Sequence, residues 1–433
     1  MTDLEMAKLI AQAVKQYGGK TYFTGGYVRD SLLKKENNDI DIEIFGLDKD
    51  TFIRAVSGLG NVISFGKSYR VFHIAGYDID ISLSDKSLFD SCKRRDLTIN
   101  SIAMDVLNNE IVDYFNGVKD LKEKVINYVD KKTFVQDKLR VFRVARFASV
   151  YGFTISEDTL EYCKSIDVDD ISKERVFSEL CIALTRSERP SIYIESLKKM
   201  NKLDYWFKEV KQLIGVTQNP IYHGEGDVYT HTLMVLDQAA ILKDKSSYPL
   251  GFMFTALCHD FGKYVARQVV DGVIHNYAHE KEGLPLVKEF LNRFTDDKYL
   301  HKYVSNMVLL HMAPNKLAFE KSSIKATNKM FDQAIDKKGL VLFALADDKG
   351  RISDIKHDDY TPFLLERLEI YEEYMSRDHI TGQDLKELGI SESNLYKELL
   401  QYGHKLHLSG VGKQSAIKQL LHYYKELKEN LDH

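Results

Sequence analysis

The chain has 433 residues, of which 44% are hydrophobic and 29% charged, and its formal net charge is −4. This length fits two to four globular domains, and no apolar run approaches the roughly 20 residues of a membrane span, which argues against a membrane partner. The acidic balance counts mildly against a nucleic-acid partner, although a local basic surface suffices to bind one.

The N-terminus and the cysteines indicate a cytoplasmic protein. Residues 1–18 have the pattern of an amphipathic helix with acidic residues, which is not typical of a signal peptide. The four cysteines are scattered, without a C-x-x-C pair, at Cys92, Cys163, Cys181 and Cys258. This distribution favours reduced thiols over a disulfide framework or a zinc site.

A glycine pair follows the first predicted strand. Residues 21–23 predict a strand that feeds a turn at Gly25 and Gly26, and residues 28–33 predict the next helix. Because glycine has no Cβ, backbone N–H groups in such a turn can approach a triphosphate closely. Arg29, on the first turn of the helix, can reach the same phosphates. The turn is therefore a predicted phosphate-binding site.

Two aspartates alternate with isoleucines in the next stretch. Asp39, Ile40, Asp41 and Ile42 have the period of a strand, so that both aspartates project from one face. Two adjacent carboxylates are unfavourable unless a cation lies between them, and hard oxygen ligands with substrate phosphates favour Mg²⁺. The alternative is a solvated edge strand, because D-x-D alone is a common pattern.

The combined motif resembles a known enzyme family. GGYVRDSLL (residues 25–33) followed by DIDIE (residues 39–43) is similar to the active-site signature of class II tRNA nucleotidyltransferases and bacterial poly(A) polymerases, in the polymerase-β-like nucleotidyltransferase superfamily. The resemblance implies an α+β fold, with a small mixed-sheet head followed by an all-helical neck, an HD domain and a helical tail. It also implies that Asp39 and Asp41 are catalytic metal ligands.

A third carboxylate is implied on the second of two strands expected at residues 71–75 and 77–83. The family carries an acid there, and Asp80 is the matching position. Asp78 faces the same way, so the choice of Asp80 depends on the resemblance. A third carboxylate is what a two-metal site needs. The family usually continues with an arginine, whereas this chain has Ser84 and Asp85.

Residues 92–105, CKRRDLTINSIAMD, match the family motif R-R-D-[LF]-T-[IV]-N-A, with Ser101 for the usual alanine. Arginine offers fork-shaped donors for phosphate, which suits Arg94 and Arg95. The resemblance implies that Asp96 and Asn100 bind ribose hydroxyls. Residues 112–121 resemble a flexible family segment, in which Gly117 is a hinge and Asp120 a turn residue.

Residues 134–153 contain arginines at intervals of three, which form one stripe of a predicted helix and are expected to bind the nucleotide: Arg140, Arg143 and Arg146. The family motif here is E-D-x-x-R, whose Asp and Arg act as a template for the incoming base. Asp137 and Arg140 match, and Gln136 replaces the glutamate. A carboxylate accepts from the exocyclic NH₂ of C and A, whereas U and G present the wrong donor pattern. The alternative is a salt-bridged surface helix.

The motif ISKERVFSEL (residues 171–180) matches the family's E-R-[IV]-x-x-E-L. We interpret Glu174, Arg175 and Glu179 as structural residues that hold helix ends together.

Histidine and aspartate recur between helical stretches after Gln218. His231, His259, Asp260 and Asp347 resemble the H…HD…D pattern of the HD phosphohydrolase superfamily, with Asp348 as a neighbouring alternative to Asp347. Such ligands suit Mg²⁺, Mn²⁺, Ni²⁺ or Fe without strong selection, so a divalent metal of unspecified identity is expected. The chemistry expected is metal-assisted phosphoester hydrolysis. Two further histidines, His279 and His311, are candidates for further ligands or phosphate contacts.

The expected domains are a nucleotidyltransferase head (1–130), a helical neck that binds RNA and nucleotide (131–213), an HD domain (214–360) and a helical tail (361–433). The function implied is template-independent addition of CCA to the 3′ end of tRNA from CTP and ATP, with Mg²⁺ in the head. One alternative is a poly(A) polymerase, or an enzyme that adds only CC or only A. Another is an HD phosphohydrolase with a nucleotide-binding head.

Overall fold

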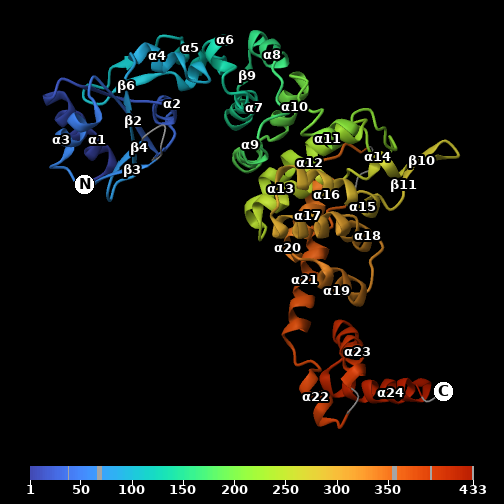
Figure 1. Ribbon diagram of the computed structural model, residues 1–433. Helices are drawn as coiled ribbons and strands as arrows, with labels where there is room; N and C mark the ends of the chain where they lie inside the picture. Colours follow the sequence, from blue (N-terminus) through green and yellow to red (C-terminus); the bar gives the residue numbers. More distant parts are fainter. Residues whose placement is uncertain (38, 66–70, 354–357, 391–392, 432–433) are drawn as a thin grey trace. The chain divides into compact units, whose positions relative to one another are not determined.

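The computed structural model describes residues 1–37, 39–65, 71–353, 358–390 and 393–431. The chain forms two compact units, Met1–Tyr205 and Trp206–His433 (Figure 1). None of the helices in the described ranges combines the length and the apolar character that a membrane crossing requires. All four cysteines are free.

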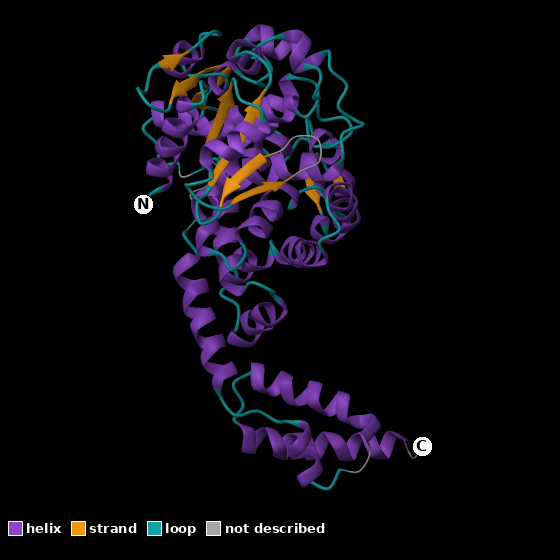
Figure 2. Cartoon of the chain, turned by 60° about the vertical axis from the view of Figure 1, so that its left-hand side comes forward, coloured by secondary structure: helices purple, strands orange, loops and turns teal. Residues whose placement is uncertain are grey.

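The first unit contains the mixed sheet expected for the head (Figure 2, strands in orange). Seven strands lie in the order β3 (Val62–Phe65), β4 (Val71–Ile74), β5 (Ile79–Ser84), β2 (Ile40–Phe45), β1 (Lys20–Phe23), β6 (Ala103–Asp105) and β7 (Ile111–Val112). Strands β2 and β5 are parallel, and the other neighbours are antiparallel. The sequence did not predict β3, β6 or β7.

Alternation of apolar and polar residues sets the two faces of this sheet. Ile42 and Ile44 of β2 and Ile81 of β5 are buried, whereas Asp41 lies on the opposite face. The helices of the head are α1 (Asp3–Gln16), α2 (Gly26–Leu32), α3 (Lys49–Val56), α4 (Leu88–Lys93), α5 (Gly117–Glu123) and the 3₁₀ helix η1 (Thr98–Asn100). The apolar face therefore forms the core, and the acidic face is left for a ligand.

The segment expected to be flexible is packed instead. Gly117 begins α5, and a Cβ at this position would lie 2.2 Å from the carbonyl oxygen of Thr98. The Thr98 hydroxyl donates to Asp120 at 2.5 Å. The glycine thus permits close helix contact, and its interpretation as a hinge stays a prediction.

The rest of the first unit is mainly helical, but the two-residue strand at Thr154–Ile155 departs from the all-helical neck that was expected. It comprises β8 (Val125–Ile126), α6 (Lys131–Phe134), α7 (Arg140–Tyr151), β9 (Thr154–Ile155), α8 (Glu157–Lys164), α9 (Lys173–Arg186) and α10 (Ser191–Lys199). Helix α7 packs against α9 and α10. The chain is not helical throughout residues 134–153, and Asp137 lies in the turn between α6 and α7.

The second unit carries the histidine-rich region. Its helices up to the tail are α11 (Lys208–Gln212), α12 (Val228–Leu242), η2 (Lys243–Lys245), α13 (Pro249–Cys258), α14 (Lys263–Ala266), α15 (His279–Glu282), α16 (Leu284–Phe294), α17 (Lys298–Leu310), α18 (Ala313–Phe319), α19 (Ile324–Gln333) and α20 (Lys337–Lys349). The expectation of an all-helical region is wrong in one respect. A hairpin of β10 (Arg267–Val270) and β11 (Val273–Asn276) turns at Asp271 and Gly272, both with positive φ.

The last part of the second unit is helical, as expected for the tail. It contains α21 (Thr361–Ser376), α22 (Gly382–Glu387), η3 (Ser393–Leu395), α23 (Tyr396–Leu408) and α24 (Lys413–Leu431). Leu385, Leu399 and Leu420 are fully buried in a small core of their own.

Candidate active site and metal centre

Three aspartates gather on the acidic face of the head sheet. Asp41 on β2 and Asp80 on β5 are register partners in parallel strands, and Asp39 lies directly before β2. Burial, together with the charges of Asp80 and Asp39, raises the pKa of Asp41, and Arg95 opposes this shift. Carboxylates that destabilise one another's charge fit a site for a cation.

The head site is open rather than a closed cage. Within the described ranges, groups of three potential ligand atoms within 4.8 Å of one another occur only in the second unit. The Asp80 carboxylate also lies 3.3 Å from Nε2 of His73. An open carboxylate site suits a cation such as Mg²⁺, which keeps waters and takes phosphate oxygens as ligands.

The glycine turn leaves space beside these carboxylates. Gly25 has a φ of 66°, and a Cβ there would lie 3.3 Å from Oδ2 of Asp41 and 3.6 Å from Nη1 of Arg95. A side chain at position 25 is thus disfavoured by backbone conformation and would also crowd the gap between the acid and the arginine. The turn can therefore admit a ligand close to the backbone.

Arg29 is held in a polar network. Its Nε and Nη2 donate to the Asp30 carboxylate at 2.9 and 2.8 Å, and its Nη1 donates to Oδ1 of Asn100 at 2.6 Å. Tyr151 also donates to Asp30, at 2.7 Å. The network fixes the guanidinium, and Asp30 joins it to the Tyr151 hydroxyl.

The network continues through Asp96. One carboxylate oxygen accepts from the Leu97 amide at 2.8 Å and from Asn100 Nδ2 at 2.9 Å, and the other accepts from Arg143 Nε at 2.6 Å. Burial opposes the charge of Asp96, but Arg143 and Asn100 hold its pKa below the usual value. An ionised carboxylate has about four acceptor positions, so one remains for a ligand hydroxyl.

The three arginines of α7 have different environments. Arg140 donates to the backbone carbonyls of Thr133 at 2.7 Å and of Arg94 at 2.5 Å. Arg143 lies within 3.7 Å of Glu179, and the buried Arg146 donates to the same glutamate. The acidic partners of the stripe thus come from other elements, and Glu179 has the structural role that its motif indicated.

One cavity of about 380 Å³ brings most of the predicted head and neck residues together. It is lined by Gly25, Gly26, Arg29, Asp41, Arg94, Arg95, Asp96, Asn100, Asp137, Leu139, Arg140, Arg143, Phe147 and Arg175. Asp39, Asp80 and Arg146 are not part of this lining. The cavity therefore combines two aspartates, Asp41 and Asp137, with six arginines and the expected ribose-binding pair.

Arg175 is a functional candidate that sequence reasoning assigned to structure alone. Its Nη2 donates to both oxygens of Asp137, at 2.9 and 2.8 Å. The motif match showed that an arginine belongs at this position, but not that it faces Asp137, 38 residues away. Arg175 thus holds the carboxylate that the family resemblance assigns to base recognition.

The second unit gathers four buried histidines around two aspartates. His231 of α12 has Nε2 3.1 Å from Asp347 of α20, and His259 has Nε2 3.2 Å from Asp260. Asp348 instead pairs with Arg351, at 2.9 Å. Of the two neighbouring aspartates, Asp347 is the one beside His231.

His279 and His311 complete this cluster. His279 Nε2 lies 3.2 Å from Oδ1 of Asp260 and 3.1 Å from Nε2 of His311. Burial, together with the neighbouring imidazoles His279 and His259, lowers the pKa of His311 to about 3. His311 is therefore a neutral imidazole at physiological pH, the form that binds metal ions.

Asp260 is the strongest sign that the cluster fits a metal ion. It is buried, with Lys263 Nζ 2.7 Å from Oδ2 and with Nε2 of His279 3.2 Å from Oδ1. Burial opposes its charge, but His259 and Lys263 hold the pKa of Asp260 well below the usual value. A buried carboxylate surrounded by imidazoles is a favourable place for a metal ion, because imidazole and carboxylate are transition-metal ligands.

Glu225 supports the cluster from outside. Its Oε1 lies 3.1 Å from His231 Nδ1 and 2.8 Å from His223 Nδ1, and its Oε2 accepts from the Ile352 amide at 2.9 Å. A carboxylate on Nδ1 orients a metal-binding histidine and increases its basicity. The sequence offered no signal for this role beyond the acid's place between two histidines.

Replacing Glu225 with glutamine should weaken metal binding without unfolding the domain. One carboxylate oxygen becomes an NH₂ group, so either His231 or Ile352 loses its acceptor. We expect Co²⁺ affinity to fall about 10- to 100-fold, as for other outer partners of metal ligands. Titration with Co²⁺ measures this, with Glu289→Gln as the matched exposed control. Unchanged affinity contradicts the role of Glu225.

A cavity of about 220 Å³ opens onto this cluster. Its lining combines the metal-site acids with cations and a neutral amide: His223, Asp260, Lys263, His311, Met312, Asn315, Lys316, Phe319, Asp347 and Arg351. Lys263, Lys316 and Arg351 place positive charge where an anionic group can reach the aspartates. The arrangement suits a phosphate ester.

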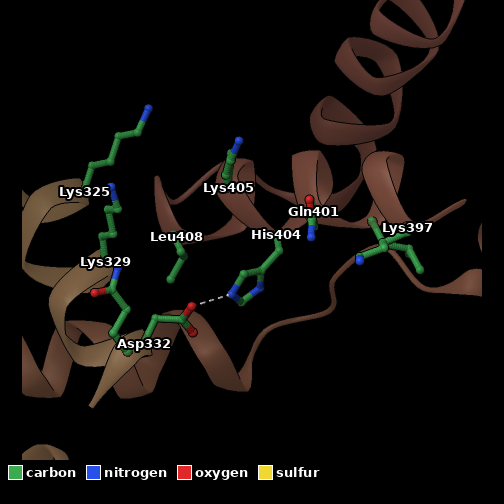
Figure 3. Close-up of a pocket in the computed structure, with 10 residues that line it drawn as sticks. Lys325, Lys329, Asp332, Lys397, Gln401, His404, Lys405 and Leu408 are labelled. Atoms are coloured by element: carbon green, nitrogen blue, oxygen red, sulfur yellow. Dashed lines mark hydrogen bonds and ion pairs between the residues drawn. The ribbon is translucent and has the colours of Figure 1, made fainter. Parts of the chain in front are cut away.

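A third cavity, of about 560 Å³, lies between α19 and α23 (Figure 3). Four lysines line it: Lys325, Lys329, Lys397 and Lys405. His404 of α23 bonds Asp332 of α19 at 2.9 Å across it. In the part of the chain that the structure describes, no ion pair neutralises the four lysines, so the groove carries local positive charge despite the acidic chain.

Comparison with known proteins finds matches to the head and to the histidine-rich region. A family model of the poly A polymerase head domain matches residues 67–127, and one of the HD domain matches residues 228–349. A multifunctional CCA protein of Pasteurella multocida (strain Pm70) is 30% identical over 413 residues, which cover 88% of this chain and 94% of the relative. Another, of Hahella chejuensis (strain KCTC 2396), is 37% identical over 299 residues, which cover 63% and 67%.

Solved structures show the same fold at low identity. The apo form I of a CCA-adding enzyme has a TM-score of 0.68 and 18% identity, and the match covers 96% of this chain and 93% of that one. The Thermotoga maritima CCA-adding enzyme complexed with tRNA has a TM-score of 0.64 and 18% identity, with 97% and 95% covered. The motif resemblance is thus confirmed, and the chain belongs to the family of multifunctional CCA proteins.

Proposed function

We propose that this protein adds CCA to the 3′ end of tRNA, using CTP and ATP. The observation that carries the proposal is the 380 Å³ cavity, where Asp41, the Gly25–Gly26 turn, Asp96 and Asp137 line one space. An acid for a metal, a turn for phosphates, a carboxylate for ribose and another for the base are the parts that a nucleotidyltransferase needs. The relatives named multifunctional CCA proteins support it.

Asp39, Asp41 and Asp80 are the proposed ligands of Mg²⁺ in the head. The open site and the mutual repulsion of these carboxylates support this assignment. Bound Mg²⁺ supplies charge neutralisation at the transferring phosphate and activation of the 3′-hydroxyl. The protein holds the carboxylates on two adjacent strands, so that the 3′-terminal hydroxyl of the tRNA and the α-phosphate of the nucleotide meet at one edge of the sheet.

Phosphates and ribose are assigned to the residues beside the glycine turn. Arg29, Arg94 and Arg95 face the cavity with donors that suit triphosphate oxygens, and Arg143 adds positive charge. Asp96 has one acceptor position left after its three hydrogen bonds, which suits a ribose hydroxyl. Arg146, enclosed with Glu179, acts by supporting α7 and not by touching the nucleotide.

Asp137 and Arg140 are the proposed base template. After its bonds to Arg175 and to the Leu139 amide, Asp137 keeps one acceptor position, and after its two backbone bonds Arg140 keeps three N–H donors. An exocyclic NH₂ can donate to Asp137 while Arg140 donates to the ring nitrogen. Cytosine and adenine share this pattern, which U and G lack.

Purified protein incubated with tRNA that lacks CCA tests the function. CTP alone should add C residues and stop, ATP alone should add little, and both together should restore one complete CCA end. Arrest after the A distinguishes CCA addition from polyadenylation. Unlimited A tails, or addition of only C or only A under every condition, would contradict the proposal in favour of its alternatives.

The groove of Figure 3 is the proposed contact for the tRNA backbone. Lys325 and Lys329 on α19 face Lys397 and Lys405 on α23, and lysines recognise phosphates through charge rather than sequence.

The four free cysteines support a cytoplasmic location, because the cytoplasm is a reducing compartment.

Reversing charge in the groove should weaken tRNA binding and leave nucleotide binding intact. For Lys325→Glu with Lys329→Glu, we expect a rise in KM for tRNA and a salt dependence shallower by about one unit of slope for each lost phosphate contact. Binding measured across a salt series provides the test. Lys288→Glu with Lys302→Glu is the matched control, since both lysines are exposed on other helices. An equal effect in both variants contradicts a specific groove.

We propose metal-dependent phosphoester hydrolysis as a second function. The specific observation is Asp260, a buried acid beside His231 and His259, which lines a cationic cavity. The protein with added Mn²⁺, Co²⁺ or Ni²⁺ should hydrolyse a chromogenic phosphoester, and His259→Ala should abolish this while CCA addition persists. Hydrolysis that survives the loss of His259 contradicts the assignment.

A further inference from the structure

The polar face of β2 carries one more acid beyond the proposed metal ligands. Glu43 follows Asp41 by two residues, so its side chain leaves the strand on the same face. It lies opposite Ser82 of β5, one step along the register that joins Asp41 to Asp80. Glu43 is only 6% exposed and is not part of the lining of the nucleotide cavity. It is therefore an acid beside the metal site that is shut off from the nucleotide itself.

Glu43 has two partners, and only one of them is charged. The Ser91 hydroxyl of α4 lies 2.8 and 2.7 Å from the two carboxylate oxygens, and it can donate its single proton to one of them at a time. Nη2 of Arg95 donates to Oε2 at 3.3 Å. Among the described residues, Arg95 forms the only ion pair with Glu43. Because a buried carboxylate is costly without a positive partner, this pair is strongly favoured over separated charges.

The other end of the Arg95 guanidinium faces the glycine turn. A Cβ at Gly25 would lie 3.6 Å from Nη1 of Arg95 and 3.3 Å from Oδ2 of Asp41. The guanidinium thus contacts Glu43 through one nitrogen and faces the space for the triphosphate with another. Because a guanidinium is planar and rigid, a bond at one nitrogen fixes the direction in which the other donates.

Arg95 also lies close enough to Asp41 to affect its charge. Burial raises the pKa of Asp41, and the positive charge of Arg95 opposes this rise. In the part of the chain that the structure describes, the two form no ion pair, and Arg95 is paired with Glu43 instead. An arginine paired with Asp41 would occupy the carboxylate oxygens that a metal ion needs. The choice of partner by Arg95 therefore matters to the metal site.

We propose that Glu43 is a positioning residue, which holds Arg95 beside the phosphate-binding turn and away from the metal ligand Asp41. Its charge engages one guanidinium nitrogen and leaves Nη1 for a phosphate oxygen. Without this charge, the attraction between Arg95 and Asp41 draws the guanidinium onto the metal site. The inference rests on the nucleotidyltransferase function proposed for the same cavity, and it adds a residue that touches neither metal nor nucleotide.

Binding of CTP to the full chain, measured by calorimetry at a series of free Mg²⁺ concentrations, tests this role. Glu43→Gln keeps the shape and an acceptor for Ser91 but removes the charge. We expect CTP affinity to fall about 10- to 100-fold, as when a hydrogen bond between charged groups is lost. The Mg²⁺ concentration for half-maximal binding should rise about tenfold, as when an outer partner of a metal site is lost. In single-turnover addition, the rate at saturating CTP and Mg²⁺ should stay near that of the native chain.

A second substitution shows whether Glu43 acts through Arg95. Arg95→Gln should lower CTP affinity by itself, because a phosphate donor is lost. Adding Glu43→Gln to Arg95→Gln should cause no further loss of affinity, and the Mg²⁺ requirement should return to that of the native chain, since no arginine is left to pair with Asp41. A further loss of affinity in the double variant, or a Mg²⁺ requirement that stays high, overturns the proposal.

Ser91→Ala is the matched control, because it removes the other hydrogen bond of the same carboxylate. If Glu43 only fastens α4 to β2, Ser91→Ala and Glu43→Gln should change the Mg²⁺ requirement alike, and this result overturns the positioning role. Glu43→Asp keeps the charge and should retain more CTP affinity than Glu43→Gln, whereas an equal loss in both also overturns it. The melting temperature of each variant reports that the chain is folded.

Failure of the proposed function gives a different result. A native chain that binds CTP but does not add it to tRNA contradicts CCA addition, while the binding measurements still report on Glu43. Addition by the native chain, with CTP affinity and Mg²⁺ requirement unchanged in Glu43→Gln, overturns the positioning role alone. A native chain that does not bind CTP overturns both.

Discussion

Replacing Asp41 with asparagine is expected to abolish CCA addition without lowering stability. Asp41 is the proposed metal ligand that lines the nucleotide cavity. Without this ligand, the transition state loses several kcal/mol of metal-dependent stabilisation. Since about 1.4 kcal/mol corresponds to a tenfold change in rate, we expect the rate of addition to fall by about a thousandfold or more. Single-turnover incorporation of CMP into tRNA that lacks CCA measures this loss.

The Asp41 substitution should not lower the stability of the folded protein. Burial and the charges of Asp80 and Asp39 raise the pKa of Asp41 in the folded state, so its ionised form opposes folding at neutral pH. A neutral asparagine removes this repulsion, and we expect an unchanged or higher melting temperature. Loss of addition together with a lower melting temperature contradicts a catalytic role at this position.

The matched control separates the acid's position from its charge. Asp78 precedes β5, is exposed and lies outside the register that joins Asp41 to Asp80. Asp78→Asn removes the same charge and should leave addition intact. Hydrolysis in the HD domain should survive Asp41→Asn, just as addition survives His259→Ala. Loss of both activities from either change would show that the two sites are not independent.

The features that the sequence predicted most clearly are those carried by residues only a few positions apart in the chain. Alternation around Asp41 was enough to place this aspartate on the polar face of a strand, because side-chain direction repeats every two residues, whereas Asp39 lies directly before the strand. Adjacent His259 and Asp260 indicated a metal site for a similar reason. Chemistry carried by a few neighbouring residues is visible before the chain is folded.

Partners supplied from distant elements were not visible in the same way. The pairing of Asp137 with Arg175, and of Arg146 with Glu179, depends on how α7 packs against α9. The stripe of arginines seemed free of acids because its partners lie about 33 to 47 residues away in the chain. Helical periodicity determines which residues share a face, but not which helix that face meets.

Glycine raised a related difficulty. Gly25 lies in a left-handed turn and Gly117 in a close packing contact. The sequence alone does not distinguish these two reasons for a glycine, because both disfavour a residue with a Cβ. The structure separates them, because a Cβ at Gly117 meets the Thr98 backbone and one at Gly25 meets the side chains of the cavity. Gly117 is needed for packing, whereas Gly25 leaves room for a ligand.

Replacing Asp137 with asparagine is expected to relax the choice of nucleotide more than it slows addition. The amide presents a donor and an acceptor, so it can pair with the edges of U and G as well as with those of C and A. Discrimination by one well-placed pair is worth about 1–3 kcal/mol. The ratio of kcat/KM for CTP to that for UTP should therefore fall between about fivefold and about 150-fold.

Arg175 determines how this result is to be interpreted. It donates to both Asp137 oxygens, so the substitution also disturbs one ion pair, and a general loss of activity could come from that source. Arg175→Lys keeps the charge and removes the fork, and should raise KM for both nucleotides while preserving their ratio. Asp169→Asn, an exposed acid of the same unit outside the cavity, should change neither. A fall in the CTP to UTP ratio that is equal in Asp137→Asn and Arg175→Lys assigns selection to the shape of the pocket, whereas a fall confined to Asp137→Asn assigns it to the carboxylate.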